Sequence, residues 1–202
     1  MHEIILPDNV KPALEWVNNR VLQKVSPKRK HALAQSRFAS ALSVWADAGG
    51  YGMVGTEWRF QVQPTGEISR TLVPDVAFLS YDRMPVEELE TTDIPRMAPD
   101  VVVEIRSPDD REEDIEEKVR VYLKAGTSVV FLVDTDRKII TVRDRHGSRV
   151  VSHAERVTHK AVPGFSTEAK TLFELPRPRL SDRESPHPAK GGGLIILPWS
   201  LQ

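Results

Sequence analysis

Residues 100–133 read DVVVEIRSPDDREEDIEEKVRVYLKAGTSVVFLV, and this stretch decides the fold. Residues 100–105 and 127–133 are short runs rich in Val and Ile or Leu, which is typical of strands covered on both faces. Between them, residues 109–125 show helical spacing and are followed by Gly126, a residue that commonly ends helices. A strand, a helix and a second strand in this order predict a βαβ unit with two parallel strands.

Further strands flank this unit. Residues 56–62 and 73–79 have strand-like patterns, and Pro74 confines the second to a sheet edge or to a strand start. Residues 64–66, Pro-Thr-Gly, form a predicted turn, and residues 138–152 are typical of a hairpin.

The clearest further helix begins at Ser26-Pro27 and ends at Gly49-Gly50, because Ser is a good N-cap and Pro suits the first helical position. Residues 9–22 are expected to be helical in part, and residues 86–89 to form a short helix. These elements together predict an α/β fold, a mixed β-sheet flanked by helices.

The chain of 202 residues is long enough for one domain with an extension. We place the domain at residues 1–175 and a disordered tail at residues 176–202, where PRPRLSDRESPHPAKGGG is rich in Pro, Arg and Gly. The final LIILPWSLQ is apolar and is interpreted either as a docking peptide or as a reading-frame remnant.

Composition excludes several classes of protein. Lys and Arg number 28 against 29 Asp and Glu, which excludes a protein that coats nucleic acid through bulk positive charge. The absence of Cys excludes disulfide scaffolds, iron–sulfur clusters and Cys nucleophiles, and the six His residues lack the spacing of zinc ligands. The sequence has no long apolar run and no signal-peptide pattern, so we expect a cytoplasmic protein that does not span a membrane.

Two acidic residues stand in apolar strand contexts. Asp75 follows Pro74 in LVPDVAF, and Glu104 interrupts VVVEI. A lone carboxylate in such a strand is costly unless it is paired or binds a metal ion. Lys118 borders the apolar stripe of the following helix, from which its ammonium could reach a neighbouring strand.

Two carboxylates and one ammonium are the groups that metal-assisted phosphodiester hydrolysis requires. The same residues also permit a structural interpretation. Glu104 and Lys118 could form a buried ion pair that fixes the helix on the sheet, and Asp75 could bond backbone N–H groups at a strand start. Spacing alone leaves both interpretations open.

The order of motifs in this chain resembles the Uma-type endonuclease family, which belongs to the PD-(D/E)XK restriction-endonuclease-like superfamily. The matching segments cover roughly residues 12–174, and they are EWVN at 15–18, PDVAFLS at 74–80, APDVVVEIRSP at 98–108, DIEEKVRVYLKAG at 114–126, VFLVD at 130–134 and PGFS at 163–166. The resemblance implies a restriction-endonuclease-like core and a Mg²⁺- or Mn²⁺-dependent DNA endonuclease, with Asp75 and Glu104 as metal ligands.

One departure from the superfamily pattern concerns the catalytic lysine. The nominal (D/E)XK motif would place Lys at position 106, where this chain has Arg106. In this family the lysine is thought to lie on the following helix, which points to Lys118. Arg106 is then an auxiliary residue that contacts phosphate. Glu15 is a candidate third acid by the same resemblance, and its alternative is a solvated acid on a helix.

Lys28, Arg29 and Lys30 are candidate nucleic-acid contacts. Positive charge at the start of a helix opposes the helix dipole, so a phosphate partner would relieve this repulsion, although a solvated surface explains the cluster equally well.

Asp134, at a strand end, is either near the site or an acid that stabilises a turn. The rival function is an inactive nucleic-acid- or protein-binding module on the same fold. By analogy with nucleases that cut both strands, a homodimer is expected.

Overall fold

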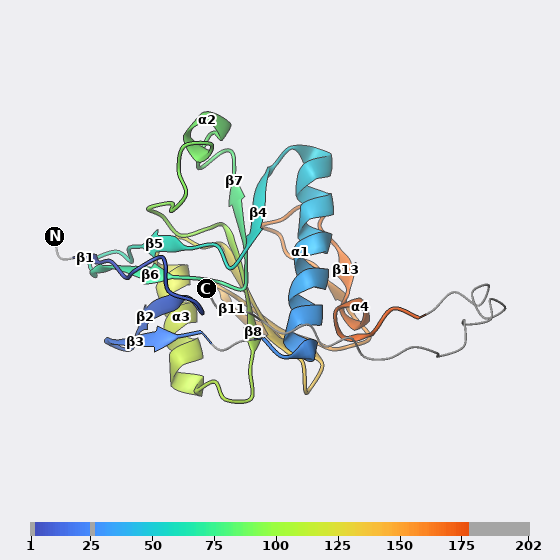
Figure 1. Ribbon diagram of the computed structural model, residues 1–202. Helices are drawn as coiled ribbons and strands as arrows, with labels where there is room; N and C mark the ends of the chain where they lie inside the picture. Colours follow the sequence, from blue (N-terminus) through green and yellow to red (C-terminus); the bar gives the residue numbers. More distant parts are fainter. Residues whose placement is uncertain (1–2, 25–26, 178–202) are drawn as a thin grey trace, which may run out of the picture.

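The structure, a computed structural model, describes residues 3–24 and 27–177. Its centre is a six-stranded mixed sheet in the order β11-β10-β9-β8-β7-β4 (Figure 1). Only β8 and β9 run parallel within this sheet, and they are the two strands of the predicted βαβ unit. The strands are β4 (Gly52–Thr56), β7 (Val76–Ser80), β8 (Val101–Arg106), β9 (Val129–Asp134), β10 (Ile139–Asp144) and β11 (Gly147–Val151).

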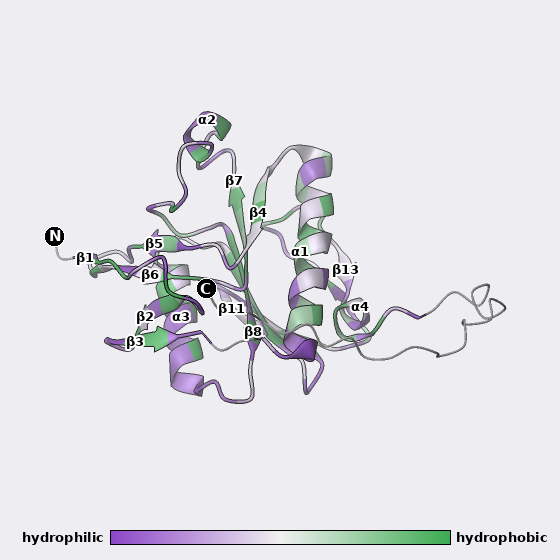
Figure 2. Cartoon of the chain, viewed as in Figure 1, coloured by the Kyte–Doolittle hydropathy of each residue, from purple (hydrophilic) through white to green (hydrophobic). Residues whose placement is uncertain are grey.

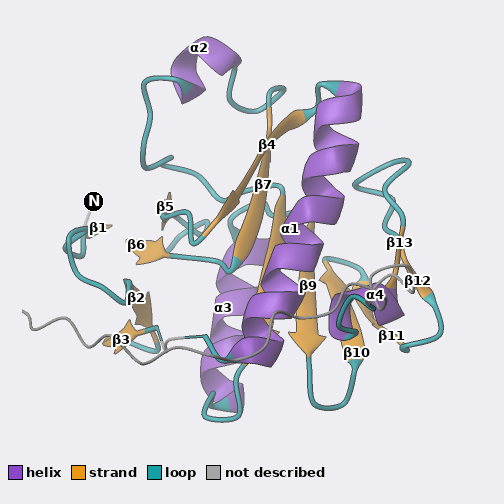
Figure 3. Cartoon of the chain, turned by 45° about the vertical axis from the view of Figure 1, so that its right-hand side comes forward, coloured by secondary structure: helices purple, strands orange, loops and turns teal. Residues whose placement is uncertain are grey.

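Helices cover both faces of this sheet. Helix α1 (Arg29–Gly49) and the short α4 (Ala169–Phe173) lie on one face, and α3 (Glu112–Lys124) lies on the other (Figures 1 and 3). Hydrophobic residues are concentrated in the central strands and on the helix sides that face them, while the beginning of α3 is strongly hydrophilic (Figure 2). The predicted α/β architecture is therefore confirmed.

The helix ends follow local chemistry. Helix α1 ends at Gly49, with Gly50 in the left-handed region at φ 60°, as the glycine pair predicts. Helix α3 starts at Glu112, three residues later than expected. The reason is a turn over residues 107–110, in which the backbone N–H of Ser107 donates to the Asp110 carboxylate at 2.7 Å.

The expected helix within residues 9–22 is wrong. The segment is a hairpin of β2 (Leu14–Val17) and β3 (Arg20–Gln23). Asn18 and Asn19 form its two-residue loop, with φ 49° and 57°. Two consecutive positive φ values suit the tight turns of hairpins, and Asn adopts them more readily than most residues.

The strand predicted over residues 56–62 is also wrong in extent. It is divided between the end of β4 and β5 (Phe60–Val62), and Glu57 between them has φ 51°. Strand β5 pairs with β6 (Ser69–Leu72), which in turn pairs with β1 (Glu3–Ile4) in a separate small sheet. Strand β7 starts at Val76, so Asp75 lies at a strand start.

The remaining elements are α2 (Val86–Leu89), as predicted, and the pair β12 (Arg156–Val157) and β13 (Thr167–Glu168). Among the described residues, no helix is both long enough and apolar enough to cross a membrane. Residues 178–202 lie outside the described part of the chain, so the tail and the boundary at residue 175 stay predictions.

Candidate functional site

Neighbouring strands bring Asp75 and Glu104 together. Val76 of β7 pairs with Val103 of β8 in an antiparallel register, and one further step along each strand places Asp75 opposite Glu104. The Asp75 Oδ2 atom accepts a hydrogen bond from the backbone N–H of Ile105 at 2.6 Å. Both carboxylates are buried, so neither is the solvated acid of an ordinary strand end.

Lys118 reaches this pair from α3. Its Nζ donates to Glu104 Oε2 at 2.7 Å and to Glu15 Oε2 at 3.0 Å, and the whole side chain is buried. Helix α3 points this lysine at the sheet because Ile115, Val119 and Tyr122 on the same side pack against the central strands. Lys118 thus contacts Glu104, and Asp75, Glu104 and Lys118 all line one cavity.

Glu15 is the third acid of this cluster. It lies on β2 and not on a helix, and it is buried, so the alternative of a solvated helix acid is wrong. Its Oε1 accepts the backbone N–H of Val73 at 2.8 Å, while Oε2 accepts from Lys118. The β2–β3 hairpin explains the inward position, because Glu15 and Val17 share the buried face of β2.

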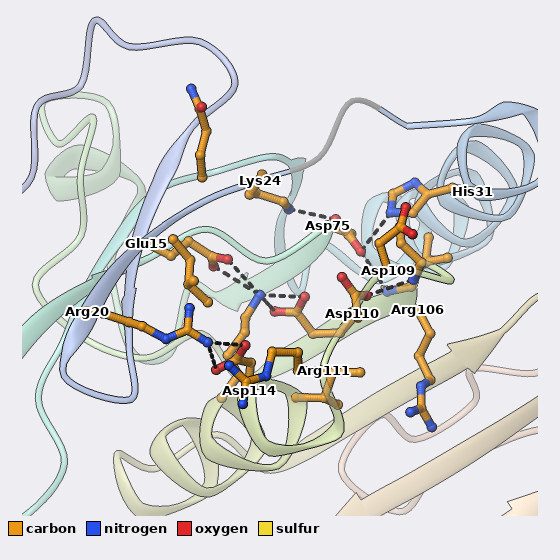
Figure 4. A pocket seen from close by; sticks show the side chains of 17 residues that line it. Glu15, Arg20, Lys24, His31, Asp75, Arg106, Asp109, Asp110, Arg111 and Asp114 are labelled. Atoms are coloured by element: carbon orange, nitrogen blue, oxygen red, sulfur yellow. Dashed lines mark hydrogen bonds and ion pairs between the residues drawn. The ribbon is translucent and has the colours of Figure 1, made fainter.

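Asp75 has two further partners, Lys24 and His31. The Lys24 Nζ lies 2.6 Å from Asp75 Oδ1, and His31 Nε2 lies 3.2 Å from Oδ2. Figure 4 shows the Asp75 carboxylate between these two side chains, which come from the residue after β3 and from the first turn of α1. With the Ile105 N–H, the partners of this carboxylate thus come from three distant parts of the chain.

Burial and charge shift the pKa values of these groups in opposite directions. Burial raises the pKa of Glu104 to about 8; the charge of Lys118 opposes the shift, and those of Asp75 and Glu15 add to it. Burial acts upward on Asp75 as well, but the charge of Lys24 and the hydrogen bond from His31 hold its pKa below the usual range. Burial therefore disfavours the ionised form of Glu104, and a cation bound beside it would favour that form.

The donor set fits Mg²⁺. Within the described residues, no group of three or more His, Asp or Glu side chains could hold a metal ion, so the protein can offer only a small set of ligands there. Mg²⁺ commonly binds one or two carboxylates and keeps several waters. Glu104 Oε1 is buried and accepts no hydrogen bond of good geometry, although Lys118 Nζ lies 2.7 Å away. A metal ion at Glu104 would bind through this oxygen, beside the Lys118 ammonium.

The cluster opens into a cavity of about 240 Å³. Besides Glu15, Asp75, Glu104 and Lys118, its lining includes acidic residues from the region where α3 begins: Asp109, Asp110 and Asp114. Arg20 lines it too, and its Nη2 donates to both carboxylate oxygens of Asp114, at 2.8 and 2.7 Å. The cavity is large enough for water and a phosphate group, and charged residues line much of it.

Arg106 lines the same cavity but does not join the acids. Its guanidinium pairs with Glu112 and points away from Asp75 (Figure 4). Asp134 is a turn acid, because its Oδ1 accepts the backbone N–H groups of Asp136 and Arg137 at 3.1 and 2.8 Å. The partners of both residues thus lie outside the group of buried carboxylates.

Lys28, Arg29 and Lys30 lie on the exposed beginning of α1. Lys28 Nζ is 3.9 Å from Asp109, and Lys30 Nζ is 2.6 Å from Asp136. They line a second hollow of about 260 Å³, which shares four lining residues with the cavity of the acids: His31, Arg106, Ser107 and Asp109. The three cations are thus near the site and outside its buried cluster.

Comparison with known proteins places the chain in a family. The sequence profile of the Uma2 family, described as "Putative restriction endonuclease", matches residues 2–170. The chain belongs to the Uma2 family. No curated protein is similar enough to match.

One similar solved structure is that of a putative nuclease belonging to DUF820 from Anabaena variabilis ATCC 29413. It shares 27% sequence identity with this Uma2 chain at a TM-score of 0.73, and the alignment covers 83% of this chain and 93% of that one. The fold is therefore restriction-endonuclease-like, as the resemblance implied.

Lys24 and His31 are the site residues of this Uma2 protein that sequence reasoning missed. Lys24 follows a hairpin that we expected to be a helix. His31 follows three basic residues, a pattern that is typical of a solvent-exposed surface. Both contact Asp75 although they lie more than 40 residues from it in the sequence, and local sequence patterns do not predict contacts over such separations. A correct interpretation of Asn18-Asn19 as a hairpin loop was the available signal for Lys24.

Proposed function

We propose that this protein is a Mg²⁺-dependent DNA endonuclease that hydrolyses phosphodiester bonds. The observation that carries the proposal is the pair of buried carboxylates, Asp75 and Glu104, on adjacent strands with the Lys118 ammonium 2.7 Å from Glu104. The descriptions of the family as a restriction endonuclease and of the similar structure as a nuclease support the same chemistry.

Asp75 and Glu104 would hold the metal ion, which lowers the pKa of bound water and neutralises charge on the phosphate. Asp75 is fixed by the Ile105 N–H, and Glu104 is oriented by Lys118, so both carboxylates are positioned before substrate binds. Lys118 lines the cavity, from which its ammonium would orient the attacking water or stabilise charge on the scissile phosphate. Glu15 would keep Lys118 in place from the other side.

The nucleic acid would approach over the start of α1. Lys28, Arg29 and Lys30 are exposed there, beside the hollow that borders the cavity, and would contact phosphates outside the reacting group. Arg106 would contact phosphate only after leaving Glu112. A homodimer would allow both strands to be cut, and sedimentation of the protein with and without DNA tests this part of the proposal.

Cleavage of supercoiled plasmid tests the function directly. The full chain is incubated with Mg²⁺, Mn²⁺ or EDTA, and nicking is quantified for wild type, Glu104→Gln and Lys118→Met. We expect metal-dependent nicking by wild type and none by either variant. Nicking that survives in EDTA, or in Glu104→Gln, would contradict a metal site at these carboxylates.

One observation favours the rival function, a binding module without turnover. The cavity lining includes the exposed residues Asp109 and Asp110, whose negative charge repels a phosphate backbone. The net charge of −1 agrees with this. The rival predicts no nicking with any metal ion, and DNA retention in a mobility-shift assay then separates a nucleic-acid-binding module from a protein-binding one.

A further inference from the structure

Lys24 is the second buried lysine of the site, and its ammonium is surrounded by acceptors. Its Nζ lies 2.6 Å from Asp75 Oδ1, 2.9 Å from the carbonyl oxygen of Val73 and 3.0 Å from Glu57 Oε2. The side chain is only 12% exposed. Burying a lysine this far is costly unless its charge is matched, and Asp75 provides the closest match.

The two oxygens of Asp75 have different partners. Oδ2 faces the backbone N–H of Ile105 at 2.6 Å and His31 Nε2 at 3.2 Å, which fix the carboxylate to β8 and α1. Oδ1 has Lys24 as its partner. A metal ion at Asp75 would therefore bind through Oδ1, the oxygen that the ammonium already contacts. Two cations cannot share one carboxylate oxygen at contact distance without strong mutual repulsion.

We propose that Lys24 is an internal counter-ion which a divalent metal ion must displace from Asp75, so that Lys24 sets the metal affinity of the site. This inference rests on the proposed metal-dependent function. Lys118 contacts Glu104 and Glu15, and the proposed function assigns its ammonium to the attacking water or the scissile phosphate, a role that Lys24 does not share.

Glu57 gives the displaced ammonium a place to go. This carboxylate already contacts Lys24, is 43% exposed and receives a hydrogen bond from Gln35 at 3.0 Å. Its backbone N–H donates to the Asp75 carbonyl oxygen at 3.2 Å, so Glu57 stays beside Asp75 whichever cation Asp75 holds. When a metal ion displaces Lys24 from Asp75, Lys24 thus keeps its ion pair with Glu57.

Metal binding to the full chain tests the proposal without relying on activity. Calorimetric titration with Mn²⁺ compares wild type, Lys24→Met, Lys24→Arg and Lys124→Met. Lys124 lies on α3 outside the cavity, beside Glu67, so its variant controls for the loss of one positive charge. We expect Lys24→Met to bind Mn²⁺ at least about tenfold more tightly, because a repelling charge is removed from the ligand. Lys24→Arg and Lys124→Met should stay near the wild-type affinity.

The outcomes separate the two proposals. If wild type binds Mn²⁺ and Lys24→Met binds it equally or more weakly, the counter-ion role is overturned while the metal site stands. If neither protein binds Mn²⁺, the proposed function fails and the role of Lys24 fails with it.

A second measurement on wild type covers the case in which Lys24→Met does not fold. Acetylation of lysines, followed by mass spectrometry, should modify Lys24 slowly without metal and faster with Mn²⁺, relative to exposed Lys28. Equal protection of Lys24 with and without Mn²⁺ overturns the proposal.

Discussion

Helix α3 carries two charged clusters that obey different physical rules. The inner cluster, Lys118 with Glu15 and Glu104, is buried against the sheet, and the Lys118 side chain is 11% exposed. The outer cluster joins α3 to β6 and the turn before it, and the side chains of Arg120 and Lys124 within it are each 45% exposed. Its members are Glu67, Arg70, Glu117, Arg120 and Lys124.

The pKa shifts of one acid from each cluster show the difference. In the outer cluster, hydrogen bonds from Arg120 and Lys124 hold the pKa of Glu67 well below its usual range. In the inner cluster, burial raises the pKa of Glu104 to about 8, although Lys118 is in contact. The ion pairs of the outer cluster favour the ionised form of Glu67, whereas burial in the inner cluster disfavours the ionised form of Glu104. Strongly perturbed pKa values of buried groups that line a cavity are typical of functional sites, which supports the proposed function.

The largest effect is expected from Lys118→Met, which keeps the apolar stem and removes the charge. Nicking should fall by at least about 100-fold, because the ammonium acts in the transition state. The loss should exceed any loss of folded protein, since burial favours the protonated form of Glu104 and the variant leaves no unpaired charge on it. Nicking rate and melting temperature are measured on one preparation, with Lys124→Met as the outer-cluster control.

Two results would change this assignment. Activity that falls only in step with the folded fraction would make Lys118 a structural ion-pair partner. Nicking at a near wild-type rate would transfer the role to Arg106, two residues after Glu104.

The next largest effect is expected on the stabilisation of the protein by Mn²⁺, which only the inner cluster should provide. Mn²⁺ at about 100 times its dissociation constant should stabilise the wild type by about 2.7 kcal/mol, or about 5 °C or more in melting temperature. Glu104→Gln should lose this shift, because the amide is a poorer metal ligand. Glu117→Gln, in the outer cluster, should keep it. An identical shift in wild type and Glu104→Gln would remove Glu104 from the site.

The two acids also predict opposite pH dependences of stability in EDTA. Burial raises the pKa of Glu104 from 4.5 to about 8, so its contribution to stability is complete below pH 4.5 and is lost as the pH rises to about 8. The slope is at most about 1.4 kcal/mol per pH unit. Glu67 has a lowered pKa, so its contribution is present above pH 4.5 and is lost as the pH falls.

Urea unfolding at a series of pH values measures both contributions. Glu104→Gln should flatten the loss of stability between pH 5 and 8 relative to wild type, and Glu67→Gln should change only the acid side. A wild-type slope that survives in Glu104→Gln would mean that another group is responsible.

Sequence reasoning found the inner cluster for a physical reason. Glu104 and Asp75 are charges in apolar strand contexts, and Lys118 borders an apolar stripe, so each violates a local pattern that a core should keep. The unit β8–α3–β9 was predictable as well, because its two apolar runs and Gly126 are local signals.

The contacts around Asp75 could not be predicted in the same way. Leu14, Val17 and Val21 fit helical spacing, yet the segment is a hairpin because tertiary packing and the Asn18-Asn19 loop decide its structure. That hairpin positions both Lys24 and Glu15. The expected helix therefore hid the role of Lys24 and gave Glu15 the alternative of a solvated helix acid.

The smallest effect is expected from Arg120→Ala in the outer cluster. Arg120 makes ion pairs with Glu67 at 2.6 Å and with Glu117 at 2.7 Å, but water competes for the Arg120 guanidinium, whose side chain is 45% exposed. Exposed pairs of this kind contribute about 0–1 kcal/mol, and Arg70 and Lys124 remain to hold Glu67. Denaturation should therefore show a loss of no more than about 1 kcal/mol, reduced further in high salt, with nicking and the Mn²⁺ shift unchanged. A large loss of activity in Arg120→Ala would show that the two clusters are coupled through α3, and the division between a structural and a functional side of the helix would no longer hold.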